Sequence, residues 1–561
     1  MSEYLCYYQH LISMKTLQIH PGDNLLVALQ TLPAGTAVAY GGHTVVLKGE
    51  VPQKHKFAIC DLPEGSLATL YGVTVGRAAR FIPAGGLITV ENLVHEAPAY
   101  AGKTGSYHWA KPDVSKWQGR TFMGYHRPDG RVGTRNYWLV VPLVFCENGN
   151  TGVIRASLEE ALGYAPKRSN DVDATRLVAM YRSGAGVAEI LKTDLAAPPP
   201  EQPVTRVFPN LDGIKFLTHD GGCGGTRDDS EALCHLLAGY IANPNVAGAT
   251  VLSLGCQHAQ AGLLKEALVN FDGATGKPVF FLEQQQSRSA QAFIGEAVKR
   301  TFTGCMMANE IRRSPAPLAK LCLGLECGGS DGFSGITANP ALGHASDLLV
   351  ALGGQAILSE FPELHGVEQE LINRCEEEAI AQKFARLMRS YNRRAEEVGS
   401  GFSKNPSPGN IRDGLITDAI KSAGAAKKGG TAPVAEVLDY TEPVTRPGLS
   451  LLCTPGNDVE STTALAGSGA NLIAFTTGLG TPTGNPVAPT IKLSTNTELA
   501  RRMSDLIDLD AGTIISGGDT VESKGEELLE LMLRVASGEM LTKTEVLGQD
   551  DFIPWKRGVS L

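Results

Sequence analysis

The stretch LCLGLECGGSDGFSGITANPALG, residues 321–343, passes from a short apolar run into a loop rich in glycine. From residue 326 onward it holds five glycines, one cysteine, one aspartate and several hydroxyl groups. In α/β sheets, ligands bind outside the carboxyl ends of the strands. The stretch therefore indicates either a tight turn or a place where bare backbone closes around a small polar ligand.

Further apolar runs alternate with helical segments along most of the chain. The runs include NYWLVVPLVF, GATVLSLG and NLIAFTT, and the helical segments include DDSEALCHLLAGYIA and ELARRMSDLIDL. This alternation predicts an α/β multidomain fold with glycine-rich loops at strand ends. Residues 15–96 differ, because short strand-like runs separated by Pro or Gly predict a small β-rich barrel or sandwich there. Residues 97–120 are polar and predict a linker.

Length and charge exclude several classes of protein. The 561 residues are too many for one core and suggest about three domains, and the net charge is −9. Short basic pairs such as Lys427–Lys428 are interpreted as solvated surface, and residues 421–436 as an exposed connection. No apolar run approaches the ~20 residues of a membrane helix. We expect no nucleic-acid or membrane partner, and a cytoplasmic protein with reduced thiols.

Five cysteines stand at, or shortly after, the ends of apolar runs: Cys146, Cys223, Cys256, Cys327 and Cys453. A thiol at a strand end can coordinate a metal or act as a nucleophile. The alternative is that each is a small buried apolar side chain. There is no CxxC pair, so a zinc ribbon is not indicated, and an iron–sulfur cluster has only a weak spacing signature.

Histidine, aspartate and lysine supply candidate acid–base groups. His219 stands next to Asp220 in THDGGC, and a carboxylate can fix the tautomer of an imidazole. Lys404, within GFSKNPSPGN, is the alternative base or a clamp for a carboxylate. His20 and His55 lie in turn-like positions of the small β-rich domain. GxxxxGK[ST] and GxGxxG motifs in the required context are missing, so nucleotide binding is not indicated.

Several longer motifs resemble one known family. IHPGDNLLVAL, GYHRPDGRVGTRNY, ECGGSDGFSGITANPALG, ILSEFPELHG, NPSPGN and TPGNDVESTTALAGSGANLIAFTTGLGTPTGNP resemble the altronate/galactarate dehydratases. The resemblance runs from about residue 15 to 545. It implies an N-terminal SAF domain over 15–96, a second domain over 121–250 and a C-terminal catalytic α/β domain over 251–545.

The resemblance implies a hydro-lyase reaction. D-Altronate would give 2-keto-3-deoxy-D-gluconate and water, and galactarate or a related sugar acid is the alternative substrate. The family implies a divalent metal, with iron(II) expected, manganese(II) as the alternative and an iron–sulfur cluster left open. Loss of the C2 proton next to a carboxylate needs concentrated positive charge, which a metal supplies as a Lewis acid.

The motifs quoted above suggest which residues carry out this chemistry. The expected catalytic groups are His219, Asp220, Lys404 and Asp331. The expected metal ligands are Cys223, Cys256 and Cys327 with His219 as a fourth, or His20 and His55. The expected substrate-binding residues are Arg131, Arg135, Ser330, Ser334, Thr337, Asn339, Asn405 and Ser407.

Two other classes of function compete with this reading. A non-catalytic sugar-acid or metal-binding protein would keep the scaffold and release no keto acid. A hydrolase with a cysteine nucleophile lacks a recognisable nucleophile-elbow context. A homo-oligomer is expected, with a dimer as the most frequent arrangement.

Overall fold

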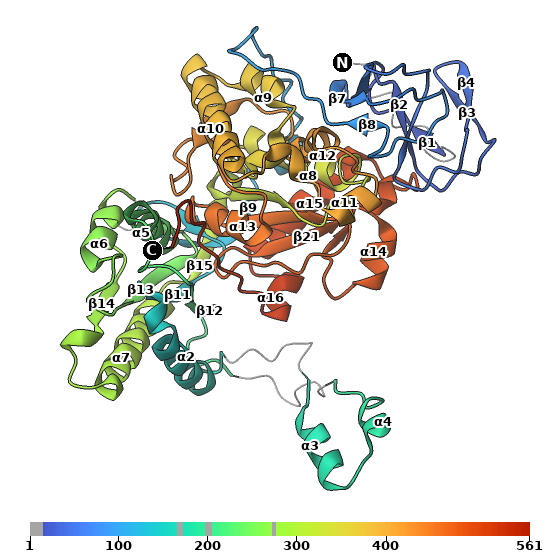
Figure 1. Ribbon diagram of the computed structural model, residues 1–561. Coiled ribbons are helices and arrows are strands. Elements are labelled where there is room, and N and C mark those ends of the chain that lie inside the picture. Colours follow the sequence, from blue (N-terminus) through green and yellow to red (C-terminus); the bar gives the residue numbers. More distant parts are fainter. Residues whose placement is uncertain (1–14, 165–171, 197–204, 272–275, 561) are drawn as a thin grey trace.

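The computed structural model describes residues 15–164, 172–196, 205–271 and 276–560. This part of the chain forms an N-terminal β unit, a second α/β unit and a larger C-terminal α/β unit (Figure 1). The expected α/β multidomain fold with a small β-rich unit at the N-terminus is confirmed.

The N-terminal unit consists of short strands in antiparallel sheets ordered β1-β2-β5, β3-β4 and β6-β7-β8. Pro-containing turns separate the strands, and alternate side chains fill a core that includes Leu25, Val27 and Val75. Its strands are β1 (Thr16–Leu17), β2 (Leu25–Ala28), β3 (Ala37–Tyr40), β4 (His43–Val46), β5 (Lys56–Ala58), β6 (Leu67–Leu70), β7 (Val73–Ala78) and β8 (Leu93–Val94).

The second unit is a parallel sheet ordered β12-β11-β13-β14 with helices on both faces. Successive side chains of β11 point to opposite faces of the sheet, and both faces are apolar. Trp138 and Val140 pack with α2 and α7 on one face, whereas Leu139 and Val141 pack with α5 and α6 on the other. Its elements are β11 (Tyr137–Pro142), α2 (Asn148–Leu162), α3 (Thr175–Arg182), α4 (Val187–Ile190), β12 (Gly213–Phe216), α5 (Arg227–Ala242), β13 (Val246–Ser253), α6 (Ala261–Val269), β14 (Val279–Glu283) and α7 (Ala290–Asn309).

The second unit continues past residue 250, where the sequence placed its end. β14 pairs with β13 in parallel, from Ala249 opposite Val279 to Ser253 opposite Glu283, and α7 covers the same sheet. A small antiparallel sheet ordered β10-β9-β15 then leads into the C-terminal unit, with β9 (Thr121–His126), β10 (Val132–Gly133) and β15 (Arg313–Pro317).

The C-terminal unit is built on a parallel seven-stranded sheet ordered β18-β19-β17-β16-β20-β21-β22. Helices α8 and α15 cover one face and α13 packs on the other. Its strands are β16 (Cys322–Cys327), β17 (Gln355–Leu358), β18 (Val434–Leu438), β19 (Gly448–Leu452), β20 (Leu472–Thr477), β21 (Thr490–Ser494) and β22 (Leu509–Asp510). Its helices are α8 (Ala338–Ala351), α9 (Glu368–Arg374), α10 (Glu378–Glu397), α11 (Pro408–Arg412), α12 (Asp418–Ala425), α13 (Asp458–Gly467), α14 (Thr497–Arg502), α15 (Val521–Ala536) and α16 (Lys543–Leu547).

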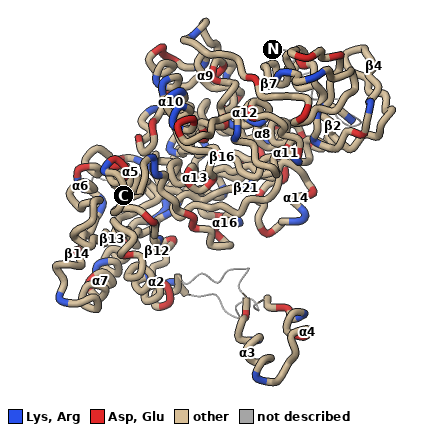
Figure 2. The backbone as a smooth tube through the Cα atoms, viewed as in Figure 1, with Lys and Arg blue, Asp and Glu red and all other residues tan. Residues whose placement is uncertain are grey.

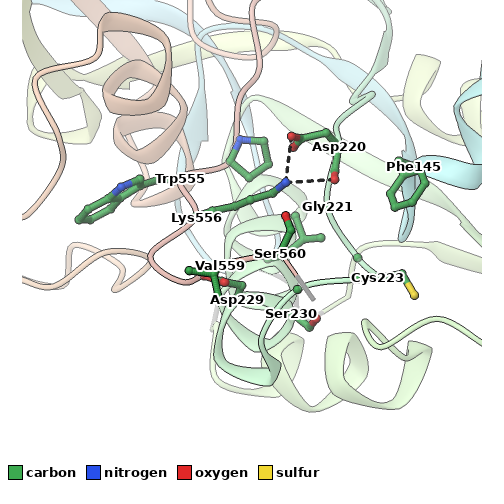
Figure 3. Close-up of a pocket in the computed structure, with 15 residues that line it drawn as sticks. Phe145, Asp220, Gly221, Cys223, Asp229, Ser230, Trp555, Lys556, Val559 and Ser560 are labelled. Carbon is green, nitrogen blue, oxygen red and sulfur yellow. Dashed lines mark hydrogen bonds and ion pairs between the residues drawn. The ribbon is translucent and has the colours of Figure 1, made fainter. Parts of the chain in front are cut away.

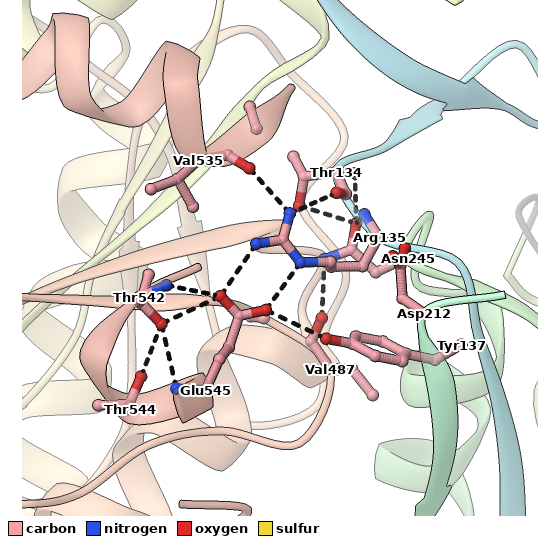
Figure 4. A network of polar contacts seen from close by, with 12 residues as sticks. Thr134, Arg135, Tyr137, Asp212, Asn245, Val487, Val535, Thr542, Thr544 and Glu545 are labelled. Carbon is pink, nitrogen blue, oxygen red and sulfur yellow. Dashed lines mark hydrogen bonds and ion pairs between the residues drawn. The ribbon is translucent and has the colours of Figure 1, made fainter. Parts of the chain in front are cut away.

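A buried ion pair joins the start of the second unit to the end of the C-terminal unit (Figure 4). Arg135 donates to both carboxylate oxygens of Glu545, at 2.7 and 2.9 Å, and to the carbonyl of Val535 at 2.8 Å. Burial opposes the charge of Glu545, but the Arg135 charge outweighs it and holds the pKa of that carboxyl below its usual value. The guanidinium of Arg135, which the sequence suggests as a substrate-binding group, therefore bonds to protein groups.

Glu545→Gln is expected to lower the free energy of unfolding by about 2 kcal/mol, because a charged hydrogen-bonded pair loses one charge. Stability from a carboxylate with a lowered pKa is present above the unfolded pKa and is lost as the pH falls through the folded pKa. Urea denaturation at pH 7 measures the effect. The exposed pair of Arg300 and Glu296 is the control, and Glu296→Gln should change stability by less than about 0.5 kcal/mol. Equal effects at the two sites would contradict this.

Basic and acidic residues are distributed along the backbone of all three units (Figure 2). None of the helices in the described part of the chain has the length and apolar character needed to cross a membrane.

Candidate active site

Polar side chains gather at the carboxyl edge of the seven-stranded sheet, where the strand order reverses. From β16 the chain continues to β17 on one side, and it later returns to β20 on the other. The loops after β16 and β20 are joined by backbone hydrogen bonds, from Gly328 to Thr476 (3.1 Å) and from Gly478 to Gly329 (3.0 Å). A topological switch point of this kind is where open α/β sheets bind ligands.

A thiol and two glutamates from neighbouring strand ends form the centre of this site. The Cys327 amide donates to Glu360 Oε2 (3.1 Å), and the Cys327 thiol donates to Glu363 Oε2 (3.0 Å). All three side chains are buried. Burial and the charge of Glu363 raise the pKa of Glu360 to about 7. Burial and the nearby carboxylates likewise raise the pKa of the Cys327 thiol well above its usual value.

Two buried lysines balance these groups. Lys428 Nζ lies 2.6 Å from Glu360 Oε2 and 2.7 Å from Cys327 Sγ, and Lys421 Nζ lies 2.7 Å from Glu363 Oε1. Burial disfavours the charge on Lys428, but Cys327 and Glu360 outweigh it and raise its pKa well above the usual value. Lys428 is 1% exposed, so the interpretation of Lys427–Lys428 as solvated surface is wrong for this residue.

On the other side of β16, Glu326 faces α13. Its Oε2 accepts from Ser359 (2.9 Å) and Ser461 (2.7 Å). Burial and the charge of Glu360 raise the pKa of Glu326 well above its usual value, and burial and Glu363 raise that of Asp458 to about 6. Asp458 lies against the backbone of Gly328, because a Cβ there would lie 2.0 Å from Asp458 Oδ2.

Lys492 completes the site from β21. Its ammonium lies 3.2 Å from the centroid of the Phe475 ring, and burial lowers its pKa to about 7. Groups whose pKa values approach 7 from opposite directions can exchange protons at neutral pH. Lys492 and Glu360 are therefore the main acid–base candidates by pKa.

Four buried polar atoms of this site have no hydrogen-bond partner among the described residues: Glu326 Oε1, Glu360 Oε1, Asn405 Nδ2 and Lys492 Nζ. Buried polar groups in native proteins are nearly always paired, so such atoms need an explanation such as a bound ligand or ion. Two are acceptors and two are donors. A metal ion and a polyhydroxy acid would together satisfy both kinds.

Backbone strain is concentrated here as well. Among the described non-glycine residues, Lys54, Tyr71, Glu360 and Thr441 have positive φ angles, and Glu360 has φ 64°. Left-handed backbone is unfavourable for a residue with a Cβ and clusters at functional sites. At Glu360 the left-handed conformation turns the chain just after β17. The Glu360 carboxylate pairs there with Lys428.

The N-terminal unit covers this edge of the sheet. Lys54 Nζ pairs with Asp331 Oδ2 at 2.9 Å, and Lys56 Nζ donates to the carbonyl of Gly414 at 2.7 Å. A Cβ on Gly332 would lie 2.4 Å from the Lys54 carbonyl, and one on Gly335 would lie 2.2 Å from the Tyr71 hydroxyl. At these two loop glycines the bare backbone therefore makes room for the N-terminal unit, a third possibility beside the tight turn and the ligand contact that the sequence suggests.

Three of the expected site residues lie at this edge. Cys327 is at its centre, and Asp331 follows it on the same loop, paired with Lys54. Asn405 Oδ1 accepts from Lys421 at 3.1 Å. Asn405 and Asp458 are only half-buried and lie where the site approaches solvent.

The other expected substrate-binding residues of these loops have structural contacts. Ser334 bonds to Asp331, Thr337 to the carbonyls of Phe333 and Thr495, and Asn339 to Gly424 and Thr476. The Ser330 carbonyl accepts from Asn410, and Ser407 caps α11. Lys404 is exposed and donates to the carbonyl of Gly399.

His219 and Asp220 lie in the second unit and do not form the expected acid–base pair. His219 Nε2 donates to the Pro142 carbonyl (2.8 Å) and Nδ1 accepts from the Gly221 amide (3.1 Å), so both ring nitrogens are occupied. Asp220 pairs instead with Lys556 at 2.9 Å, beside a cavity of about 220 Å³ that Cys223 also lines (Figure 3).

The expected cysteine ligand set is not assembled among the described residues. Three groups of His, Cys, Asp or Glu have ligand atoms within 4.8 Å of one another, and Cys223, Cys256, His20 and His55 belong to none of them. These groups contain a single cysteine, Cys327, so an iron–sulfur cluster finds no matching set there. His20 accepts from the Gly22 amide, His55 contacts the Gln53 carbonyl, and Cys256 is exposed.

Arg131 likewise has a structural role. Its Nε pairs with Asp129 at 2.7 Å and its Nη2 donates to the carbonyl of Ala242.

Seven residues of the site were not expected from the sequence: Glu326, Glu360, Glu363, Lys421, Lys428, Asp458 and Lys492. The first signal that could have found them is charge inside apolar runs, as in LGLEC and TIKLS, because an unpaired charge is rarely buried without a function. The second is SEFPEL, where two glutamates directly follow a strand.

Comparison with known proteins identifies the three units of the chain. Three family models match in order: the altronate/galactarate dehydratase SAF domain over residues 14–96, the second domain of D-galactarate dehydratase/altronate hydrolase over 124–309, and the C-terminal domain of D-galactarate/altronate dehydratase over 318–560. The third match contains every strand of the seven-stranded sheet.

The chain is also similar over almost its whole length to curated proteins. It is 33% identical to altronate dehydratase of Escherichia coli over 98% of this chain and 100% of that protein, and 33% identical to altronate dehydratase of Bacillus subtilis over 94% and 95%. It is 32% identical to galactarate dehydratase (L-threo-forming) of Escherichia coli over 95% of this chain and 94% of that protein. The chain therefore belongs to the altronate/galactarate dehydratase family and is a hydro-lyase.

Proposed function

We propose that this hydro-lyase is metal-dependent and converts D-altronate to 2-keto-3-deoxy-D-gluconate and water. The observation that carries the proposal is the set of four unpartnered buried atoms at the switch point of the C-terminal sheet. Two relatives named altronate dehydratase support the choice of substrate. Galactarate is the second candidate, because a relative named for it is almost equally similar.

The carboxylates of Glu326, Glu360 and Asp458 fit a divalent metal. Each offers an oxygen within 4.8 Å of the others, and Glu326 Oε1 and Glu360 Oε1 are the unpartnered atoms. Oxygen ligands suit manganese(II) and, in carboxylate-rich sites, iron. The overlapping group of Cys327, Glu360 and Glu363 fits less well, because Lys421 and Lys428 already bind its donor atoms. A metal held by the three carboxylates would supply a Lewis acid for a substrate oxygen.

The remaining groups have roles that their charges suggest. Lys421 with Asn405 Nδ2 would bind the substrate carboxylate, since a cation and a free amide donor lie side by side. Neutral Lys492 would accept the C2 proton, because burial lowers its pKa to about 7 and so favours the unprotonated amine near neutral pH. The reaction removes one proton from C2 and one hydroxide from C3. Together they make one molecule of water, so no net proton is taken up or released.

The test is the release of keto-deoxy acid from D-altronate by protein purified without oxygen. Product should form with iron(II) and disappear after a chelator is added. Turnover of galactarate, but not of altronate, in the same assay would keep the reaction and change the substrate. Binding of either acid to metal-loaded protein without any product would favour the non-catalytic alternative and overturn the proposal.

A further inference from the structure

A second group of potential metal ligands lies where the N-terminal unit meets the C-terminal unit. His95 directly follows β8, His365 follows the short helix Phe361–Leu364, and Asp418 is the first residue of α12. One ligand atom from each lies within 4.8 Å of the others. The two imidazole rings are nearly parallel, with centroids 5.1 Å apart.

Three polar atoms of this group have no hydrogen-bond partner among the described residues. Asp418 is fully buried, and neither of its carboxylate oxygens has a hydrogen-bond partner among the described residues. His95 Nδ1 is buried and equally unpartnered within the same described segments. Burying a carboxyl group without any hydrogen bond is costly, so these atoms together indicate that something binds between them.

The orientation of His365 adds an independent indication. Its Nδ1 lies 2.9 Å from Glu368 Oε1, and Glu368 Oε2 accepts from the Gly366 amide at 2.6 Å. When the Glu368 carboxylate accepts a hydrogen bond from Nδ1–H of His365, the lone pair of the neutral ring lies on Nε2, where it can bind a metal. This carboxylate–histidine arrangement is the usual support of a metal-binding imidazole.

We propose that His95, His365 and Asp418 bind one divalent transition-metal ion, separate from the ion of the catalytic carboxylates. Two imidazoles and one carboxylate favour zinc, iron or cobalt over magnesium or calcium. Because His95 belongs to the end of the N-terminal unit and the other two ligands to the C-terminal unit, the ion fastens the two units together. A cavity of about 190 Å³ is bordered by His365 and its partner Glu368.

The proposed ion also acts on the position of a catalytic lysine. Asp418 and Lys421 stand three residues apart on α12 and so share one face of the helix. Lys421 pairs with Glu363 in the catalytic cluster. Fixing Asp418 therefore fixes the helix that presents Lys421, which makes the three ligands positioning residues for the active site.

Cobalt(II) titration of the metal-free full-length protein tests the site. The Glu360→Gln variant, in which the catalytic carboxylate set is broken, should still bind one equivalent of cobalt(II) with the visible absorption of a nitrogen-ligated ion. Adding His365→Gln or Asp418→Asn should abolish that equivalent. Glu368→Gln should weaken it by about 10–100-fold, as expected for a residue that orients a ligand. His43→Gln, on exposed β4, is the matched control and should leave the titration unchanged.

Two results would overturn the proposal. One is a Glu360→Gln protein that binds no cobalt(II). The other is a titration that His365→Gln and Asp418→Asn leave unaltered while circular dichroism shows both variants folded. Neither result depends on turnover, so failure here is distinct from failure of the proposed reaction.

Proteolysis gives a second readout of the same site. Zinc-loaded protein should resist trypsin within residues 97–120, which hold Lys103 and Lys111, better than metal-free protein does. Asp418→Asn should remove the protection by zinc. Equal protection by zinc in Asp418→Asn would contradict a metal that fastens the two units.

Discussion

Replacing Glu360 by glutamine is expected to lower turnover by about 10²–10³-fold and to remove the catalytic metal. Glu360 is shared by both potential metal groups at the switch point, and its Oε1 has no partner among the described residues. Glutamine keeps the shape but loses the charge that attracts the ion and balances Lys428. Losing one electrostatic contributor to an enolate-like transition state has an effect of this size. Anaerobic turnover with iron(II) and metal content after gel filtration measure both consequences.

Glu147→Gln is the matched control for this change. Glu147 is fully buried, has an unpartnered Oε1 within the described chain and lies in the second unit. Its replacement should leave turnover and metal content unchanged. If both variants lost activity equally, a general effect of removing a buried charge would explain the result, and the metal assignment would fail.

Replacing Lys492 by methionine is expected to abolish proton abstraction while leaving the fold at least as stable. Removal of a general base typically lowers turnover by about 10²–10⁴-fold. Lys492 Nζ is buried without a hydrogen-bond partner among the described residues, so the apolar side chain relieves a penalty of about 1–3 kcal/mol. Part of that gain is offset by the lost contact with the Phe475 ring. Turnover and urea denaturation measure the two effects separately.

The same lysine predicts two pH dependences. Burial lowers the pKa of Lys492 to about 7, so turnover should fall as the pH drops through about 7 and the amine becomes protonated. Between this pH and the usual pKa of lysine, the unfolded chain binds more protons than the folded one. Stability contributed by Lys492 therefore rises with pH across that window, and Lys492→Met should lack this rise.

Lys277→Met is the contrasting control. Lys277 is also buried, but its Nζ donates to three backbone carbonyls at the end of α5, those of Ile241, Ala242 and Asn243. Its replacement removes these three hydrogen bonds, so stability should fall while turnover per folded molecule is retained. A Lys492→Met protein that kept full turnover would remove Lys492 from the mechanism.

Much of the fold is predictable from local patterns. Apolar runs of four to eight residues alternating with helical segments fix a parallel sheet, because such strands must be covered on both faces. The glycine-rich loop after residue 327 ends the strand that lies at the switch point. Cys327 could be selected in advance because a thiol at a strand end is conspicuous, and Asn405 because it stands among turn formers and small hydroxyls.

The glycines themselves could not be interpreted from the sequence. Gly332 and Gly335 have little space for a side chain because Lys54 and Tyr71 of the N-terminal unit press against them. A glycine that admits a ligand and one that admits another part of the same chain have the same local sequence. Only the packing of the units distinguishes the two cases.

Local patterns and the family motifs are enough to predict the order of the three units, the α/β architecture and the strand end around which the site is built. Which charges meet at that strand end depends on the packing of distant segments. The charges of Lys54, Lys421 and Lys428 become tolerable only because the fold brings carboxylates from other segments within ion-pair distance. Lys492 has no such partner among the described residues, and burial lowers its pKa instead. A lysine in a loop such as AAKKGG has the same local sequence whether it faces water or a buried glutamate. Burial and pairing are properties of the assembled fold, and they set the pKa values on which the chemistry depends.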